Sequence, residues 1–470
     1  MRVLQLSAEL FPFIKTGGLA DVAAALPVAL RDAGAEPRLL LPGHPALMHA
    51  LEGAEALAPD TAAGPLLRGQ LPGFNGIPVY LLAHESFERD GPLYGHADDA
   101  ARFARLGAAA VRLCEGWDPG WAPQLLHAHD WHAGAACAQL AWSRAQLRSG
   151  TRSLFTVHNL AYQGLFPASE FPLLGLPAGW FGLEGVEFFG QLSFMKAGLQ
   201  FADQLSTVSP GYAKEIQTAE QGCGLDGLLR RRADALHGIL NGVDAAVWNP
   251  ATDPALPTRY SAGQWAAKAQ CKDALRREFG LSTSEGPLFA VVSRLTEQKG
   301  LPLVLDALPE LLDQGGQLVV LGQGEEAPRM AFAAQTYTGQ VALAQAFDEA
   351  LAHRIYAGAD VVLMPSRFEP CGLSQLYGLK YGTLPLVRRV GGLADTVVDC
   401  TLEDLEADRA TGFVFERFET ADYRRALERA FTLWRKPTLW RQVQRRAMAQ
   451  DFGWEAAAQR YLALYRNLFQ

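Results

Sequence analysis

The sequence lacks the features that mark a secreted, disulfide-bonded or membrane protein. It has only six cysteines among 470 residues, and none forms a C-x-x-C pair. Dispersed cysteines of this kind are typical of buried thiols in a reducing compartment. No charged segment followed by an apolar one opens the sequence, and no apolar run has the length needed to span a bilayer. We therefore expect a cytoplasmic protein with no membrane partner.

Positive charge is also scarce. The chain carries 42 lysines and arginines against 50 aspartates and glutamates, a net charge of −8, and it has no block of basic residues. Nucleic acids and anionic membrane surfaces are bound through cationic faces, so we expect neither as a partner. A few local cations are still enough to bind a small anionic ligand.

The sequence is rich in short apolar runs that alternate with helix-length segments. In its first half the runs that predict strands are 3–7, 38–41, 79–82, 125–128, 154–157 and 205–209, and the segments that predict helices include 19–32, 98–115 and 132–146. This βαβ alternation predicts an α/β fold with a mostly parallel sheet covered on both faces.

The alternation is interrupted once. Residues 240–244 and the proline-rich stretch 249–257 fit neither pattern, after which strand-like runs resume at 288–293, 317–321 and 361–364. Because 470 residues exceed what one hydrophobic core usually supports, two domains are expected. We predict a Rossmann-like domain over 1–240, a second over 241–452, and a C-terminal helix within 453–470.

A glycine-rich loop follows the first predicted strand. Lys15 precedes Gly17 and Gly18, and a helix is expected from Leu19. Paired glycines let the backbone approach a phosphate, and the positive end of the helix dipole favours the same ligand. The spacing is not that of a Walker A loop, because the lysine precedes the glycines. An ordinary strand-to-helix turn explains the glycines equally well.

Two further loops carry candidate chemistry in the second half. Arg294 and Lys299 follow a predicted strand, where cations can stabilise a departing diphosphate, although ordinary surface charges are the alternative. Glu369 lies in a loop between the strand ending at 366 and the helix starting at 374. Open α/β sheets bind ligands at such strand ends. A glutamate there predicts a sugar or phosphate clamp.

Histidines cluster at 127, 129 and 132, next to Asp130. Imidazole and carboxylate groups are common metal ligands, but no distant fourth ligand accompanies them, so we expect neither a metal nor a cofactor. His158 also follows a predicted strand, and a lone histidine there is often a hydrogen-bonded structural residue.

Three of these segments together, residues 15–21, 293–300 and 367–373, resemble the bacterial glycogen synthase and plant starch synthase family. The likeness extends from Val3 to the C-terminal helix. It implies the GT-B fold, two Rossmann-like domains with an intervening cleft, in which the last helix crosses back to the first domain. It also implies a retaining glycosyltransferase that moves glucose from ADP-glucose to the non-reducing 4-OH of an α-1,4-glucan and releases ADP.

The resemblance also assigns roles to individual residues. The implied catalytic residues are Arg294, Lys299, Glu369 and His158; the implied donor contacts are Lys15, Gly17, Gly18, Asn241, Phe347, Cys371, Gly372, Leu373 and Ser374; and the implied acceptor-side residues are Asp21, Tyr94 and Asp130. Two positions depart from the family pattern. Ala346 stands where glycine is common before the aromatic Phe347, and Ser374 stands where threonine or asparagine is common.

Two other functions remain open at this point. One is a related glycosyltransferase that uses UDP-glucose or a different acceptor, and the other is a non-catalytic protein that binds a sugar nucleotide or a glucan. The combination of Arg294, Lys299 and Glu369 favours catalysis, since preorganised charges lower the barrier for a leaving diphosphate. No lysine carries the signals of a pyridoxal site, as a phosphorylase would require.

Overall fold

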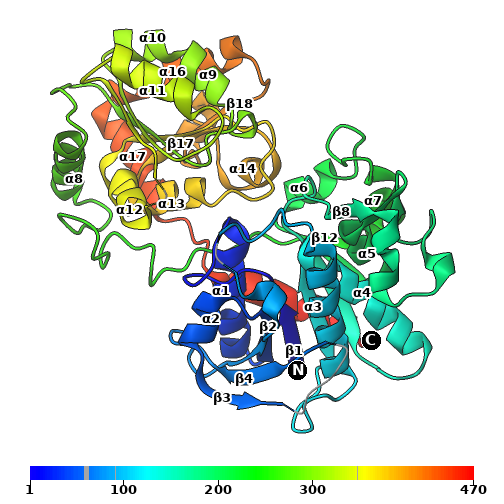
Figure 1. Cartoon of the computed structure of the whole chain (residues 1–470). Coiled ribbons are helices and arrows are strands. Elements are labelled where there is room, and N and C mark those ends of the chain that lie inside the picture. Colours follow the sequence, from blue (N-terminus) through cyan, green and yellow to red (C-terminus); the bar gives the residue numbers. More distant parts are fainter. Residues whose placement is uncertain (58–62, 90, 347) are drawn as a thin grey trace. The chain divides into compact units, whose positions relative to one another are not determined.

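The computed structural model describes residues 1–57, 63–89, 91–346 and 348–470, which form two α/β units (Figure 1). The first unit comprises Met1–Gly242 together with Trp454–Gln470, and the second comprises Val243–Gly453. Each unit has its own sheet and its own hydrophobic core.

The sheet of the first unit has nine strands within the described ranges, in the order β12-β11-β7-β6-β1-β2-β5-β4-β3. They are β1 (Arg2–Leu6), β2 (Glu36–Pro42), β3 (Glu52–Ala56), β4 (Leu66–Gln70), β5 (Pro78–Leu82), β6 (Leu125–His129), β7 (Arg152–Val157), β11 (Gln204–Thr207) and β12 (Leu236–Gly238). Pairing is parallel from β12 to β5, whereas β4 and β3 add antiparallel strands at one edge. The predicted apolar runs are the central strands, buried because helices cover both faces.

Helices of the first unit are α1 (Gly18–Asp32), α2 (Pro45–Ala50), α3 (Asp99–Cys114), α4 (Trp131–Ala145), α5 (Phe194–Phe201), α6 (Pro210–Glu215), α7 (Asp226–Arg231) and α18 (Trp454–Asn467). The last of these comes from the far end of the chain. Its buried Tyr461 and Tyr465 share a core cluster with Val22 and Leu26 of α1, and the red helix lies against the blue one in Figure 1. The C-terminal helix is therefore part of the first unit.

The first unit also holds small elements outside its main sheet. A three-stranded antiparallel sheet is formed by β8 (Leu165–Pro167), β10 (Gln191–Ser193) and β9 (Glu187–Phe188). Short 3-10 turns are η1 (Glu85–Phe87), η2 (Ala168–Leu174), η3 (Ala178–Trp180) and η4 (Ala233–Ala235).

The second unit has a fully parallel sheet of six strands in its described part, in the order β15-β14-β13-β16-β17-β18. They are β13 (Leu288–Val292), β14 (Gln317–Leu321), β15 (Val341–Ala344), β16 (Val361–Met364), β17 (Leu384–Arg388) and β18 (Phe413–Phe415). This is the strand order of a Rossmann fold, in which the chain reverses its direction of progress between the first and fourth strands.

Helices cover this sheet on both sides (Figure 1). They are α8 (Trp265–Glu278), α9 (Leu301–Asp306), α10 (Leu308–Asp313), α11 (Ala327–Thr336), α12 (Glu349–Gly358), α13 (Ser374–Tyr381), α14 (Gly391–Thr396), α15 (Leu402–Glu406), α16 (Thr420–Trp434) and α17 (Pro437–Met448), with one 3-10 turn, η5 (Glu297–Lys299).

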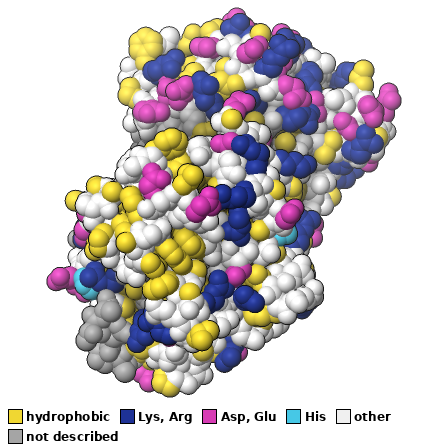
Figure 2. Space-filling view, turned by 90° about the vertical axis from the view of Figure 1, so that its right-hand side faces the viewer, with side chains coloured by type: hydrophobic (Ala, Val, Ile, Leu, Met, Phe, Trp, Pro, Cys, Tyr) yellow, Lys and Arg dark blue, Asp and Glu magenta, His cyan; other side chains and the backbone are white. Residues whose placement is uncertain are grey.

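The surface carries both signs of charge. On the face shown in Figure 2, Lys and Arg side chains lie among Asp and Glu side chains and uncharged surface. Within the described residues, no helix combines the length and the apolar character needed to cross a bilayer.

A buried carboxylate ties the edge of the first sheet together. Asp118 is only 2% exposed, and its Oδ2 accepts a hydrogen bond of 2.7 Å from the Tyr80 hydroxyl. The same oxygen accepts from Arg38 and Arg68, each at 3.0 Å. Burial raises the pKa of Asp118, but the hydrogen bonds from Tyr80, from the Gly120 N–H and from Arg68 outweigh it and hold that pKa below its usual value. The ionised form is therefore the one that stabilises the fold.

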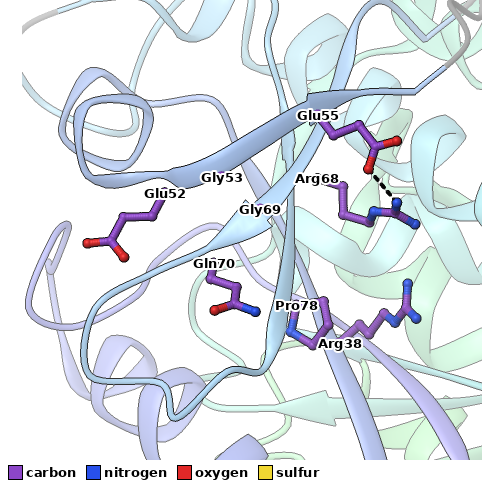
Figure 3. A pocket seen from close by; sticks show the side chains of 8 residues that line it. All are labelled: Arg38, Glu52, Gly53, Glu55, Arg68, Gly69, Gln70 and Pro78. Carbon is purple, nitrogen blue, oxygen red and sulfur yellow. Dashed lines mark hydrogen bonds and ion pairs between the residues drawn. The ribbon is translucent and has the colours of Figure 1, made fainter.

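The two arginines also line a pocket of about 540 Å³ (Figure 3). It lies near the amino-terminal starts of β2 and β5, where Pro78 begins β5. Ligands of open α/β sheets bind at the opposite, carboxyl ends of the strands. In Figure 3 the Arg68 guanidinium pairs with Glu55. We therefore interpret this pocket as part of a structural ion cluster.

Replacing Asp118 by Asn should destabilise the first unit by about 2–3 kcal/mol, because two arginines lose their shared counter-charge. Thermal unfolding measures the loss. The difference in unfolding free energy between variant and wild type should shrink as the pH falls below about 4, where Asp118 of the unfolded chain becomes protonated. It should vanish once the pH is below the lowered pKa of Asp118 in the folded protein. Glu55→Gln is the matched control: its side chain is 64% exposed, and the variant should lose less than about 1 kcal/mol. Equal losses of stability in the two variants would contradict this role of Asp118.

Candidate functional site

Each sheet has a point at which the chain passes its first strand and continues on the other side of it. In the first unit it lies between β1 and β6, and in the second between β13 and β16. The loops that follow these four strands contain most of the residues that the sequence singled out. Loops after neighbouring parallel strands emerge at the same edge of a sheet, and at such a reversal they leave a crevice for a ligand.

In the second unit an ion pair bridges the two loops at this point. Lys299 Nζ lies 2.7 Å from Oε2 of Glu369, and the Ser366 hydroxyl donates to the same oxygen at 3.0 Å. The side chains of Lys299 and Glu369 are 17% and 7% exposed. Lys299 ends η5 after β13, and Glu369 follows β16. The structure thus brings together two of the four predicted catalytic residues.

Glycines make this approach possible. Gly300 has φ 75°, and a Cβ there would lie 2.0 Å from the carbonyl oxygen of Pro365. A Cβ on Gly392 would lie 2.1 Å from the carbonyl oxygen of Cys371, and the Gly392 N–H donates to the Glu369 carbonyl at 3.1 Å. The backbone of the Glu369 loop is therefore clamped on both sides.

Arg294 lies on the same loop as Lys299 and is exposed. A second glycine loop that the sequence analysis missed packs against its neighbours. Gly322 and Gly324 follow β14 with φ of 157° and 151°, and Cβ atoms there would lie 1.9 Å from Ser293 O and 2.3 Å from Leu295 O. The signal was present in the sequence as G-x-G directly after the apolar run 317–321.

The remaining predicted donor residues of this unit surround the start of α13. Cys371 is buried, Gly372 has φ 71°, and Leu373 is the residue before the helix. Ser374 donates its hydroxyl hydrogen to the carbonyl oxygen of Val292 at 3.1 Å, so this hydrogen holds α13 against the end of β13. Phe347 lies outside the described residues, and Ala346 before it is partly buried.

In the first unit a carboxylate that the sequence analysis missed organises the glycine loop. Glu9 is 2% exposed and accepts hydrogen bonds from the backbone N–H of Thr16 at 2.8 Å and of Gly17 at 3.3 Å, as well as from the Thr16 hydroxyl. It also accepts from the Tyr94 hydroxyl at 2.7 Å. A negative charge is favourable before α1, which starts at Gly18. The backbone site that we expected to meet a phosphate is thus engaged by the protein's own carboxylate.

Lys15, the cation of this loop, forms an ion pair. Lys15 Nζ lies 2.8 Å from Oδ1 of Asp21, and it lies 4.8 Å from the centre of the Phe11 ring. Both side chains of the ion pair are about one-fifth exposed. The structure therefore places a predicted donor residue and a predicted acceptor-side residue in direct contact.

The pKa values of the predicted acceptor-side residues Tyr94 and Asp130 are both raised. Tyr94 stacks on His132 with ring centres 4.5 Å apart, and burial together with the nearby Glu9 raises the pKa of its phenol well above the usual value. Asp130 has φ 62° and ψ −178°, a region that side chains rarely adopt. Burial raises the pKa of its carboxyl to about 8, and its Oδ1 has no hydrogen-bond partner in the described part of the chain. Strain of this kind is characteristic of functional positions.

The histidines of this region are neutral. Burial lowers the pKa of His127, His132 and His158 to about 3 and that of His129 well below 6.5. His129 Nδ1 lies 3.0 Å from His158 Nε2. Among the described residues, no group of three or more His, Cys, Asp or Glu side chains has an arrangement that suits a metal ion. Asn241, near the end of this unit, is 6% exposed, and its Oδ1 has no hydrogen-bond partner in the described ranges.

Solved structures with the same architecture are glycosyltransferases. Starch synthase IV from Arabidopsis thaliana, solved with ADP and acarbose, matches with a TM-score of 0.90 and 34% identity over 100% of this chain and 99% of its own. Sucrose-phosphate synthase from Thermosynechococcus elongatus matches at TM-score 0.60 and 20% identity over 100% and 99% of the two chains, which shows the fold alone. The predicted class, a glycosyltransferase of the GT-B fold, is thereby confirmed.

Comparison at the level of sequence is more specific. Residues 2–231 match the starch synthase catalytic domain family, and residues 273–446 match the glycosyl transferases of group 1. Glycogen synthases from Leptothrix cholodnii and Variovorax paradoxus are each 52% identical over 100% of this chain and 100% and 99% of their own lengths. The chain belongs to the bacterial glycogen synthase and plant starch synthase family, as the sequence motifs predicted.

Proposed function

We propose that this protein acts as a glycogen synthase, a retaining glycosyltransferase that transfers glucose from ADP-glucose to the non-reducing end of an α-1,4-glucan and releases ADP. Full-length identity of 52% to bacterial glycogen synthases supports the activity. The ADP and acarbose held by the related starch synthase IV support an adenine nucleotide as donor group and a glucan as acceptor. Six free cysteines, five of them buried, fit a cytoplasmic location.

The observation that carries the proposal is the Lys299–Glu369 ion pair where the strand order of the second sheet reverses. A departing nucleoside diphosphate gains negative charge in the transition state. Cations already held in place stabilise that charge without reorganisation, so they lower the barrier more than they strengthen ground-state binding. We assign this role to Lys299 and Arg294, and we assign to Glu369 the binding of the donor sugar and the orientation of the Lys299 ammonium.

The other proposed substrate contacts come from both units. On the second unit the loop from Cys371 to Ser374 would approach the donor through its backbone, and Phe347 stays a prediction for the base. On the first unit Lys15 would assist at the diphosphate, and Gly17 and Gly18 would place that lysine. The remaining proposed contacts are His158 and Asn241 on the donor glucose, and Asp21, Tyr94 and Asp130 on the acceptor side.

The activity is tested by mixing purified protein with glycogen and radiolabelled ADP-glucose or UDP-glucose. We expect ADP release in equal amount to the glucose incorporated, and slower transfer from UDP-glucose. Preference for UDP-glucose would replace the proposed donor. Binding of either nucleotide sugar without any transfer would indicate a non-catalytic binding protein and contradict the proposal.

Replacing Arg294 by Ala should lower kcat about a hundredfold, because the guanidinium stabilises charge that develops only in the transition state. The KM for ADP-glucose should change much less. Arg425 of α16, whose side chain is 63% exposed, provides the matched control, and Arg425→Ala should turn over like wild type. Turnover by a folded Arg294→Ala protein within threefold of wild type would remove this assignment.

A further inference from the structure

Three buried histidines of the first unit form a continuous series that ends at the candidate site. His127 and His129 point to the same side of β6, with ring centres 4.0 Å apart. His129 Nδ1 then faces His158 Nε2 at 3.0 Å, and His158 lies directly after β7. His127 and His129 are 0% exposed and His158 is 9% exposed. The nitrogens in the middle of the series are therefore shielded from bulk solvent.

The 3.0 Å contact requires one shared proton. Burial lowers the pKa of each of these rings far below neutrality, so each imidazole is neutral at pH 7 and carries one N–H. In a hydrogen bond between two neutral imidazoles one nitrogen donates and the other accepts. Two arrangements are possible, and they give His158 opposite tautomers.

The far nitrogen of His129 distinguishes the two arrangements. His129 Nε2 is buried and has no hydrogen-bond partner within the described residues. If His158 donated, the proton of His129 would have to sit on Nε2, as a buried N–H without an acceptor. If His129 donates from Nδ1, Nε2 carries only a lone pair. A buried N–H without an acceptor is rarer in folded proteins than a buried acceptor without a donor, so the second arrangement is favoured.

We propose that His129 is a positioning residue for the transfer reaction: its Nδ1–H donates to His158 Nε2 and fixes His158 as the tautomer that carries its proton on Nδ1. The ring of His158 then presents a hydrogen-bond donor to an oxygen of the sugar, and it offers no acceptor at that nitrogen. This consequence rests on the proposed function, in which His158 contacts the donor glucose. The tautomer itself does not depend on that function.

The series is anchored at its other end. His127 Nε2 lies 2.6 Å from the Thr156 hydroxyl oxygen, and His127 Nδ1 lies 2.8 Å from the hydroxyl oxygen of Tyr465 in α18. Both ring nitrogens of His127 are thus held, so the ring is a fixed surface against which His129 packs. The C-terminal helix therefore contributes to the orientation of His158 through His127 and His129.

The tautomer is read by nitrogen NMR of the full-length protein labelled with 15N-histidine, without substrate. In wild type we expect Nδ1 of His158 protonated and its Nε2 unprotonated. His129→Asn places an amide N–H close to the former Nδ1–H, so the same His158 tautomer should persist, and kcat/KM for ADP-glucose should stay within about fivefold. His129→Ala removes the donor, and kcat/KM should fall about tenfold to a hundredfold through misplacement of His158.

The control is His237→Ala, which removes a half-buried histidine of β12 that contacts Gln204, and it should leave activity unchanged. A wild-type spectrum with the proton on Nε2 of His158 would overturn the proposal, as would a folded His129→Ala protein with wild-type kcat/KM. If His129→Ala does not fold, the spectra of wild type and His129→Asn still test the proposed tautomer of His158. Absence of glucosyl transfer by wild type would refute the proposed function and leave the tautomer measurement standing.

Discussion

The proposed activity depends on one largely buried ion pair, Lys299 with Glu369. A lysine beside a carboxylate that is itself bonded to Ser366 has its ammonium direction fixed before any substrate arrives. Removing such a carboxylate leaves an uncompensated charge in a partly desolvated place, and removing the lysine does the same to Glu369. The close backbone contact at Gly300 brings these two loops together, and the one at Gly392 holds the Glu369 loop against the start of α14, since a side chain at either position would collide with a carbonyl oxygen.

The two units place chemically different side chains where the strand order of their sheets reverses. The second unit presents charged groups where its strand order reverses, which suits a group that leaves as an anion. Beside the Lys15–Asp21 ion pair, the first unit presents neutral imidazoles and an aspartic acid whose pKa burial raises to about 8, while Glu9 satisfies the backbone N–H groups before α1. Neutral donors and acceptors in a buried setting suit sugar hydroxyl groups, which must be oriented and need no charge neutralisation.

The sequence predicted the central strands and the loops after them because those strands are buried on both faces and read as continuous apolar runs. It did not predict β3, whose residues Glu-Gly-Ala-Glu-Ala are all exposed at the edge of the sheet. The sequence did not predict the role of Glu9, because this residue stands alone in an apolar segment. Its partners Thr16 and Tyr94 become neighbours only through the fold. The strained backbone of Asp130 likewise has no local signal, since the surrounding packing imposes it.

A double-mutant cycle on Lys299 and Glu369 measures whether the two side chains act as one unit in the transfer reaction. The single variants Lys299→Ala and Glu369→Gln and the combined variant would be compared by kcat with ADP-glucose and glycogen. If each single change costs about a hundredfold, the combined variant should cost little more than the worse single one. A combined loss close to the product of the two, about ten-thousandfold, would show independent roles and contradict the account.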